Sequence, residues 1–225
     1  MSMWKALKAH VNIINQPENH LKNLIEEKGR VEKFSLNGGG LFFDFSRQRV
    51  NERTMELLFK LAEEKNLEQQ FQAMVSGEKI NTTENRAALH TASRSFSEAP
   101  VLVDGKDVMP EIRRVREEIR DFAAKIFSGE ITGSSGKPFR HAVVIGIGGS
   151  YLGTEFVSEA LRADADKNIE LHYLANVDIH NFGRIASRID PETTLWIVVS
   201  KSYTTTETSA NTRQAYNFMK ENGID

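Results

Sequence analysis

A strand, a glycine turn and a helix between residues 141 and 161 form the pattern that most constrains the fold. The run Ala142-Val143-Val144-Ile145 is apolar and mostly β-branched, which is typical of a strand buried on both faces of a parallel sheet. Gly148-Gly149-Ser150 then turns the chain, and apolar residues follow at helical spacing: Leu152, Phe156, Val157, Ala160 and Leu161. This order places backbone N–H groups and the positive end of a helix dipole at one point, which favours binding of an anion, above all a phosphate.

Two other interpretations of this turn remain open. The glycines can serve only a tight connection between strand and helix. The turn can also belong to a dinucleotide site, although the G-x-G-x-x-G pattern needs its third glycine at position 151, where this chain has Tyr151. Asp178, which lies in a loop past a predicted strand at 169–174, is near enough to the position of the acid that holds a ribose in such sites to keep this interpretation open. It also fits the N-cap of a short helix that ends near Arg188.

A second loop of the same kind follows the predicted strand 195–199. Residues 200–208 read SKSYTTTET and carry six Ser and Thr hydroxyls ahead of a helix predicted to end near Gly223. Thr204 and Glu207 fit a capping box, but capping needs only one hydroxyl. The other hydroxyls, with backbone amides, can bind phosphate oxygens without a metal. The nucleotide P-loop pattern G-x-x-x-x-G-K-[ST] is absent.

These two loops carry a resemblance to a known family. VVIGIGGSYLGTEFVSEAL followed by IVVSKSYTTTET resembles the glucose-6-phosphate isomerase family. LFFDFSRQRV at residues 41–50 and ENRAALH at residues 84–90 resemble the amino-terminal part of that family. The resemblance therefore covers nearly the whole chain in the expected order. Because the family's chains are more than twice as long, it implies that these 225 residues correspond to the front portion of such an enzyme.

The resemblance implies a substrate-binding pocket for the sugar phosphate in the two loops. The positions that match the family's motifs are Gly149, Ser150, Ser200, Lys201, Ser202, Thr205 and, as a further contributor, Thr208. Ser202 and Tyr203 stand where the family more usually has Thr and Phe, and Tyr151 where a smaller acidic residue is common. These departures affect the expected rim of the pocket and leave its phosphate-binding hydroxyls in place.

The resemblance implies no catalytic residue within this chain. An aldose–ketose isomerase needs a general base, a group that opens the sugar ring, and stabilisation of an enediolate. In the family a glutamate base and its assisting histidine, lysine and arginine lie in the later half of the chain, and the histidine comes from the partner subunit of a homodimer. Glu155, Glu159 and Glu207 lie closest to the loops in sequence, but the first two fit a solvent-facing helix and the third a cap. We expect no cofactor and no metal.

The expected fold class is α/β. Residues 1–110 are predicted to form a mostly helical amino-terminal segment with short hairpins, and residues 111–225 the first part of a sugar-isomerase (SIS)-type parallel sheet flanked by helices. Three strands leave an apolar sheet edge, so we expect the sheet to be incomplete in this chain.

Local patterns predict the remaining elements. The predicted helices lie at residues 1–15, 17–29, 51–76 with a break near Asn66, 81–94, and from Pro110 to Gly129. The predicted hairpins lie at residues 34–46 and 101–108. His10 and His20 show no ligand spacing and are predicted to be surface or edge residues.

Composition excludes some functions and agrees with the resemblance. The net charge of −2 indicates no nucleic-acid partner, and the absence of a long apolar run indicates no membrane partner. The absence of cysteine fits a cytoplasmic protein. The resemblance implies an isomerase of glycolysis and gluconeogenesis that interconverts glucose 6-phosphate and fructose 6-phosphate, is a homodimer at full length, and is inactive as these 225 residues alone. The alternative is a non-catalytic SIS-type sensor of sugar phosphates, which would lack the helical segment before Pro110.

Overall fold

A computed structural model describes residues 2–165 and 167–224 of the chain. Contacts divide the chain into two compact units, Met1–Ile112 and Arg113–Asp225. The helices and strands, with η for 3₁₀-helices, are α1 Met3–Ile14, η1 Pro17–Asn19, α2 Leu21–Leu24, α3 Arg30–Lys33, β1 Ser35–Gly38, β2 Leu41–Asp44, α4 Glu52–Glu64, α5 Leu67–Ser76, η2 Ala92–Arg94, β3 Leu102–Val103, β4 Lys106–Asp107, α6 Met109–Ser128, β5 His141–Ile145, η3 Gly148–Ser150, α7 Leu152–Ala160, β6 Glu170–Leu174, α8 Ile179–Ala186, η4 Pro191–Thr193, β7 Thr194–Val198 and α9 Thr206–Glu221. Within the described residues, no helix is both long and apolar enough to cross a membrane.

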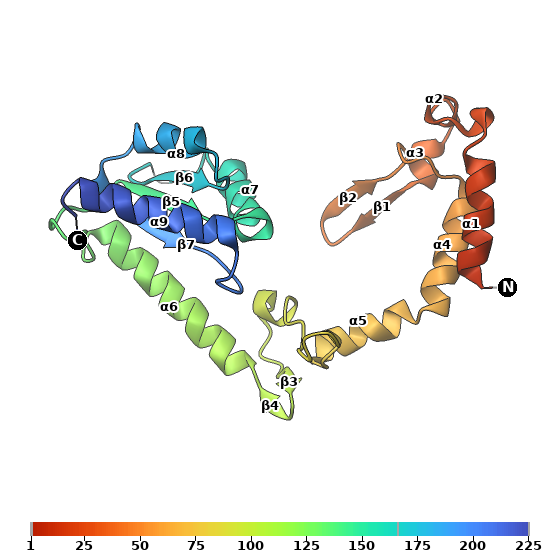
Figure 1. The fold of residues 1–225 in the computed structure, drawn as a ribbon. Coiled ribbons are helices and arrows are strands. Elements are labelled where there is room, and N and C mark those ends of the chain that lie inside the picture. The colour runs from red at the N-terminus through yellow and green to blue at the C-terminus, as the bar shows by residue number, and fades with distance from the viewer. Residues whose placement is uncertain (1, 166, 225) are drawn as a thin grey trace. The chain divides into compact units, whose positions relative to one another are not determined.

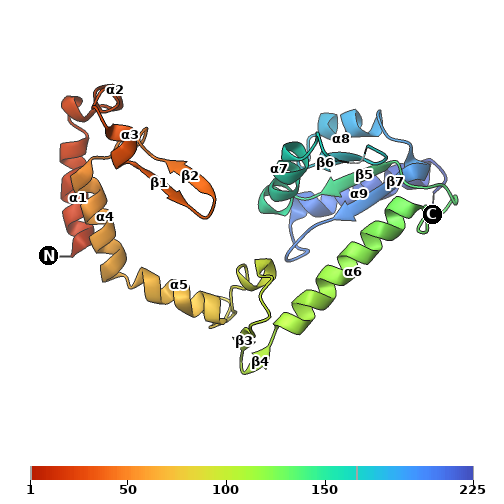
Figure 2. The same ribbon diagram turned by 180° about the vertical axis from the view of Figure 1, so that it is seen from behind.

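Helices α1 and α4 lie side by side in the first unit (Figure 1 and Figure 2). Nε2 of His10 on α1 lies 2.8 Å from Oγ1 of Thr54 on α4, and this hydrogen bond is buried. The prediction that His10 is a surface or edge residue is therefore wrong, because its side chain satisfies a polar contact between two helices. The predicted break near Asn66 is confirmed: that residue has φ +52° and separates α4 from α5.

The hairpin of β1 and β2 confirms the prediction for residues 34–46. Its strands pair in antiparallel register from Ser35 opposite Asp44 to Gly38 opposite Leu41. Gly39 and Gly40 join them with φ of +58° and +77°. Positive φ at both central residues is the requirement of a type I′ turn, and glycine meets it without a steric cost. The second predicted hairpin is also confirmed, as β3 and β4.

A buried arginine fixes the chain that follows this hairpin. Arg30 on α3 is 3% exposed. Its Nε donates to the carbonyl of Ser46 at 2.7 Å, and its Nη2 donates to the carbonyls of Gln48 at 3.0 Å and Val50 at 2.8 Å. Its guanidinium also lies 4.5 Å from the centroid of the Phe34 ring. One side chain therefore satisfies three backbone acceptors in a segment that has no regular secondary structure of its own.

Two predicted helices are not formed as expected. Residues 82–91 contain no helix, because the backbones of Asn81 and Arg86 exchange hydrogen bonds of 3.2 and 3.1 Å and close a turn. The capping contacts between Asn81 and Glu84 do form, at 3.3 and 3.1 Å, but they stabilise this turn. The predicted helix 17–29 is likewise reduced to η1 and α2, since Gly29, at φ +73°, begins α3 instead of ending one helix.

The second unit is built on a three-stranded parallel sheet with the order β6-β5-β7, as Figure 1 shows. The central strand β5 pairs with both neighbours, and Ile145 lies opposite Leu174 on one side and Val198 on the other. Residues 142–145 are 0–4% exposed, so β5 is buried on both faces. The predicted parallel sheet and the predicted α/β class are confirmed.

Helices cover both faces of this sheet. Val143, Ile145 and Leu174 pack with Phe182 and Ile185 of α8 on one face, and α9 completes that cluster through Ala215. On the other face, the hydroxyl of Tyr173 lies 2.8 Å from that of Ser158 on α7. Helices α7 and α9 therefore lie on opposite faces of the sheet, although they follow neighbouring strands.

Replacing the buried arginine tests its role in the first unit. Arg30→Ala leaves three backbone carbonyl groups, one of them buried, without their donor, and we expect it to lower the free energy of unfolding by about 3–5 kcal/mol. Arg53, an arginine of α4 whose side chain is 55% exposed, is the matched control, and Arg53→Ala should leave the unfolding midpoint in urea nearly unchanged. Equal midpoints for both variants would contradict this assignment.

Candidate functional site

The two loops predicted to bind phosphate begin side by side at the carboxyl edge of the sheet. β5 and β7 are neighbours, and the backbone N–H of Val199 donates to the carbonyl of Ile145 at 2.8 Å. Their following helices, α7 and α9, lie on opposite faces. The loops therefore diverge around a topological switch point, which is where open parallel sheets bind ligands.

The first loop is a tight turn that favours glycine at two positions. A Cβ on Gly146 would lie 3.1–3.2 Å from the backbone and Cβ of Ser150, so the turn folds back closely on the end of the strand. Gly148 has φ +54°, which is the left-handed region. Gly149 is exposed, with open space where a Cβ would stand. The backbone at Gly149 is therefore accessible to a ligand.

The second loop orders its hydroxyls by hydrogen bonds within itself. The Ser200 hydroxyl accepts from the backbone N–H of Tyr203 at 3.0 Å. The Ser202 hydroxyl accepts from the backbone N–H of Thr204 at 3.4 Å and from its hydroxyl at 2.8 Å. Because both lone pairs of Ser202 Oγ are used, its own hydrogen is left to donate to an acceptor outside the loop. Tyr203 has φ +55°, a conformation that is costly for a non-glycine residue and is often found at binding sites.

The helices that follow these loops begin without side-chain caps. Within the described residues, neither Tyr151, the N-cap of α7, nor Thr205, the N-cap of α9, makes a side-chain capping hydrogen bond. The predicted capping box of Thr204 and Glu207 is therefore wrong, because the Thr204 hydroxyl bonds to Ser202 instead. Uncapped first turns leave backbone N–H groups that an anion can satisfy.

Among the other helices that the structure describes, side chains cap α4 and α8, whereas α1, α3 and α5 begin without a side-chain cap. Asp178 accepts from the backbone N–H of His180 at 2.7 Å at the start of α8. Asn51 and Thr54 form a reciprocal capping box at the start of α4. Since Asp178 serves as a cap, its carboxylate is engaged in the structure, and this weakens the interpretation of a ribose-binding acid.

Asn211 anchors the start of α9 and was not identified from the sequence. Its side chain is 1% exposed, and its Nδ2 donates to the carbonyl of Asn176 at 3.2 Å. Thr208 and Ala215 share the buried face of α9 with it. The spacing of 208, 211 and 215 is helical, but a buried asparagine among apolar positions gives no signal without knowledge of the facing loop.

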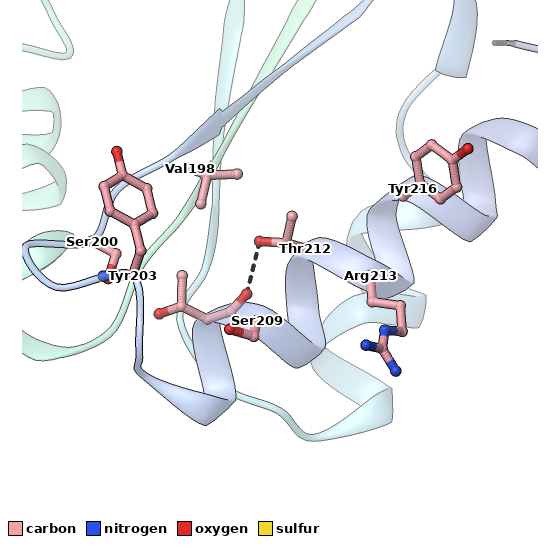
Figure 3. A pocket seen from close by; sticks show the side chains of 8 residues that line it. Val198, Ser200, Tyr203, Ser209, Thr212, Arg213 and Tyr216 are labelled. Carbon is pink, nitrogen blue, oxygen red and sulfur yellow. Dashed lines mark hydrogen bonds between the residues drawn. The ribbon is translucent and has the colours of Figure 1, made fainter.

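A cavity of about 440 Å³ opens between the second loop and α9 (Figure 3). Of the predicted site residues, Ser200 and Thr208 line it. Tyr203, expected at the rim of the pocket, lines the cavity as well, and the remaining lining residues were not predicted from the sequence: Val198, Ser209, Thr212, Arg213 and Tyr216. Positions 208, 209, 212, 213 and 216 follow helical spacing and form one side of α9, and that periodicity is the signal that could have identified them.

The structure divides the predicted binding residues between the two loops. Gly149 and Ser150 belong to η3, Ser200 to Ser202 lie in the loop after β7, and Thr205 is the N-cap of α9. Lys201 is exposed. Thr208 is only 5% exposed, and its carbonyl accepts a hydrogen bond from the Thr212 hydroxyl at 2.7 Å.

Carboxylates near the loops occupy the first turns of helices. Glu155 lies in the first turn of α7 and is half-buried, whereas Glu207 lies in the first turn of α9 and is exposed. Acidic residues at these positions interact favourably with the helix dipole, which accounts for both. The predicted site is thus a set of hydroxyl, amide and ammonium donors suited to an anion.

The fold defines the class of protein: a parallel α/β domain with helices on both faces of its sheet and two loops, one rich in glycine and one in hydroxyls, at its switch point. A family model described as phosphoglucose isomerase matches residues 44–225. The chain is 58% identical over its full length to the glucose-6-phosphate isomerase of Desulfosudis oleivorans and 44% identical over 99% of its length to that of Hahella chejuensis. The chain belongs to the phosphoglucose isomerase family.

A solved structure is similar as well. The crystal structure of a glucose-6-phosphate isomerase from Chlamydia trachomatis matches with a TM-score of 0.69 and 26% identity over 100% of this chain. The chain spans 41% and 40% of the two bacterial relatives named above and 42% of the chlamydial chain. The predicted SIS-type fold and the predicted family are confirmed.

The tight glycine turn gives a test of the first loop. Gly146→Ala forces the backbone of Ser150 to move, and we expect a loss of about 1–3 kcal/mol in the free energy of unfolding. Gly149→Ala is the matched control, because its Cβ meets nothing within 4 Å, and its effect should stay below about 1 kcal/mol. Urea unfolding measures both, and a larger loss for Gly149→Ala would contradict the described turn.

Proposed function

We propose that the full-length protein interconverts D-glucose 6-phosphate and D-fructose 6-phosphate, and that this chain carries the phosphate-binding half of the site. The observation that carries the proposal is the pair of uncapped helices that start from neighbouring parallel strands at a topological switch point. Such helix starts bind phosphate groups through backbone N–H groups and the helix dipole. Family membership supports the sugar phosphate as the ligand.

In the proposed mechanism, a general base removes the proton from the carbon beside the carbonyl and returns it to the neighbouring carbon through an enediolate. The phosphate does not react, so its binding energy serves to position the reacting carbons. Gly149, Ser150, Ser200, Lys201, Ser202, Thr205 and Thr208 are the proposed substrate-binding residues. The base and the ring-opening groups are proposed to lie outside these 225 residues.

The second loop is suited to this task because its donors are oriented before a ligand binds. Ser202 accepts two hydrogen bonds and so directs its own hydrogen outward. Lys201 adds a positive charge on the neighbouring residue. The proposal includes a homodimeric full-length form and a cytoplasmic location, both implied by the family resemblance. A dinucleotide remains the competing ligand, although Tyr151 occupies the third glycine position, with its ring 6.4 Å from that of Tyr173.

Substitution in the second loop tests the binding step. Ser202→Ala removes one hydrogen-bond donor to a charged group, a loss of about 1.5–3 kcal/mol, so we expect the dissociation constant for fructose 6-phosphate to rise about tenfold or more. Ser187→Ala is the control, because that hydroxyl donates to the carbonyl of Arg184 at the end of α8. Calorimetric titration measures both variants. Unchanged affinity in Ser202→Ala, or binding of NAD but not fructose 6-phosphate, would overturn the proposed site.

A coupled assay from fructose 6-phosphate to glucose 6-phosphate tests the division of chemistry. We expect no turnover from residues 1–225 alone, and turnover from the longer Desulfosudis oleivorans relative under the same conditions. Turnover by residues 1–225 would mean that a catalytic base lies within them. If both proteins bind the sugar phosphate and neither turns it over, a sensor role would replace the proposed isomerase.

A further inference from the structure

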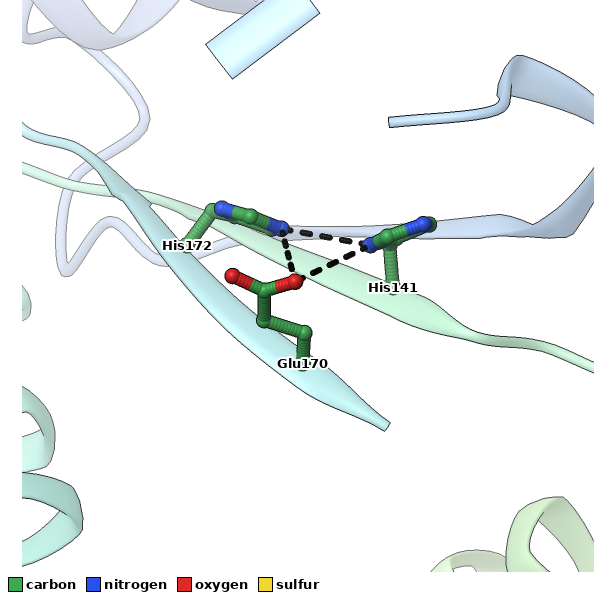
Figure 4. Close-up of side chains that lie close together, drawn as sticks. All are labelled: His141, Glu170 and His172. Atoms are coloured by element: carbon green, nitrogen blue, oxygen red, sulfur yellow. Dashed lines mark hydrogen bonds and ion pairs between the residues drawn. The ribbon is translucent and has the colours of Figure 1, made fainter. Parts of the chain in front are cut away.

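Three metal-ligating side chains meet at the amino edge of the parallel sheet, opposite the phosphate loops (Figure 4). His141 is the first residue of β5, Glu170 is the first residue of β6, and His172 is two residues further along β6. Their ligand atoms all lie within 4.8 Å of one another. The proposed isomerase reaction uses none of them.

Parallel pairing is what brings these residues together. His141 lies opposite Glu170, and Val143 lies opposite His172. Residues two apart on a strand share a face, so all three side chains stand on the face that α8 and α9 cover. The backbone there is fixed at both strand starts, because Glu170 donates to the carbonyl of Arg140 and Arg140 to that of Thr193, each at 2.8 Å. The site is therefore held by strands, which position ligands more firmly than loops do.

The distances fit a tetrahedral cation. His141 Nδ1 and His172 Nε2 are 3.3 Å apart, and two nitrogens about 2.05 Å from a tetrahedral Zn²⁺ lie about 3.3–3.4 Å apart. The Glu170 carboxylate oxygen is 4.0 Å from each nitrogen. It needs to move by only about 0.6 Å to reach the same separation, and its side chain is 63% exposed and free of tight packing.

Both histidines are largely buried. The His172 side chain is 7% exposed and that of His141 is 18% exposed. A histidine binds a metal ion through one neutral ring nitrogen and keeps its proton on the other.

We propose that His141, Glu170 and His172 form a binding site for Zn²⁺ or a similar divalent transition-metal ion. Two imidazoles and one carboxylate leave at least one coordination position for water. The sequence alone predicts no metal site, because the two histidines are 31 residues apart and follow no ligand spacing. Only the pairing of β5 with β6 reveals the site.

The test is Zn²⁺ titration of the purified full chain without a histidine tag, in competition with a chelator. We expect His141→Ala to weaken binding at least about 100-fold and Glu170→Gln about tenfold, since even outer partners of metal ligands are worth about 10–100-fold. His180→Ala is the matched control, because His180 is an exposed histidine of α8 beyond the carboxyl end of β6. It should bind Zn²⁺ within twofold of the unsubstituted chain.

Co²⁺ provides an independent spectroscopic measurement. We expect visible d–d bands of a four-coordinate ion in the unsubstituted chain and in His180→Ala, and their loss in His141→Ala. Circular dichroism measures whether each variant is folded. If His141→Ala does not fold, Glu170→Gln, which changes an exposed side chain, still tests the site. The proposal is overturned if Glu170→Gln and a folded His141→Ala both bind Zn²⁺ as tightly as the unsubstituted chain. The contact between His141 and His172 would then be an ordinary hydrogen bond.

Discussion

The parallel pairing of β5 with both of its neighbours is the interaction on which the second unit depends. Five residues, His141–Ile145, pair with β6 on one side and β7 on the other. Because residues 142–145 are almost fully buried, a shift in register would move apolar groups out of two packed faces at once. The pairing also decides what stands at each edge of the sheet. At the carboxyl edge it aligns two turns that begin helices, and at the amino edge it aligns two histidines and a glutamate.

Order along the chain and order in the sheet differ, and this difference creates the proposed binding site. The chain passes from β5 to β6 and then returns across β5 to β7. Helices α7 and α9 consequently leave neighbouring strands toward opposite faces. A ligand bound between the two loops would meet the starts of both helices, and the positive end of each helix dipole favours a negative charge. One loop alone would offer one helix start instead of two.

The sequence could predict the second unit well because its signals are local. The β-branched run of β5, the glycine turn and the hydroxyl-rich loop are contiguous, and their strand and helix limits agree with the structure to within one or two residues. The failures have a common physical cause. The burial of His10, the role of Arg30 and the anchoring by Asn211 depend on partners 16 to 44 residues away. The helix predicted at residues 81–94 was wrong because a backbone pairing from Asn81 to Arg86 uses the same capping residues.

The uncapped first turns of α7 and α9 provide a way to link stability to the proposed binding. Helices α4 and α8 use side chains of their own sequence to satisfy their first turns, whereas α7 and α9 do not. A missing N-cap costs a helix about 1 kcal/mol. If a phosphate supplies the missing acceptors, that cost is recovered only in the bound state. Ligand binding and local folding of the second loop are then thermodynamically linked. The positive φ of Tyr203 adds to the free-energy cost of the loop without a ligand. A bound ligand that holds the loop would offset this cost as well.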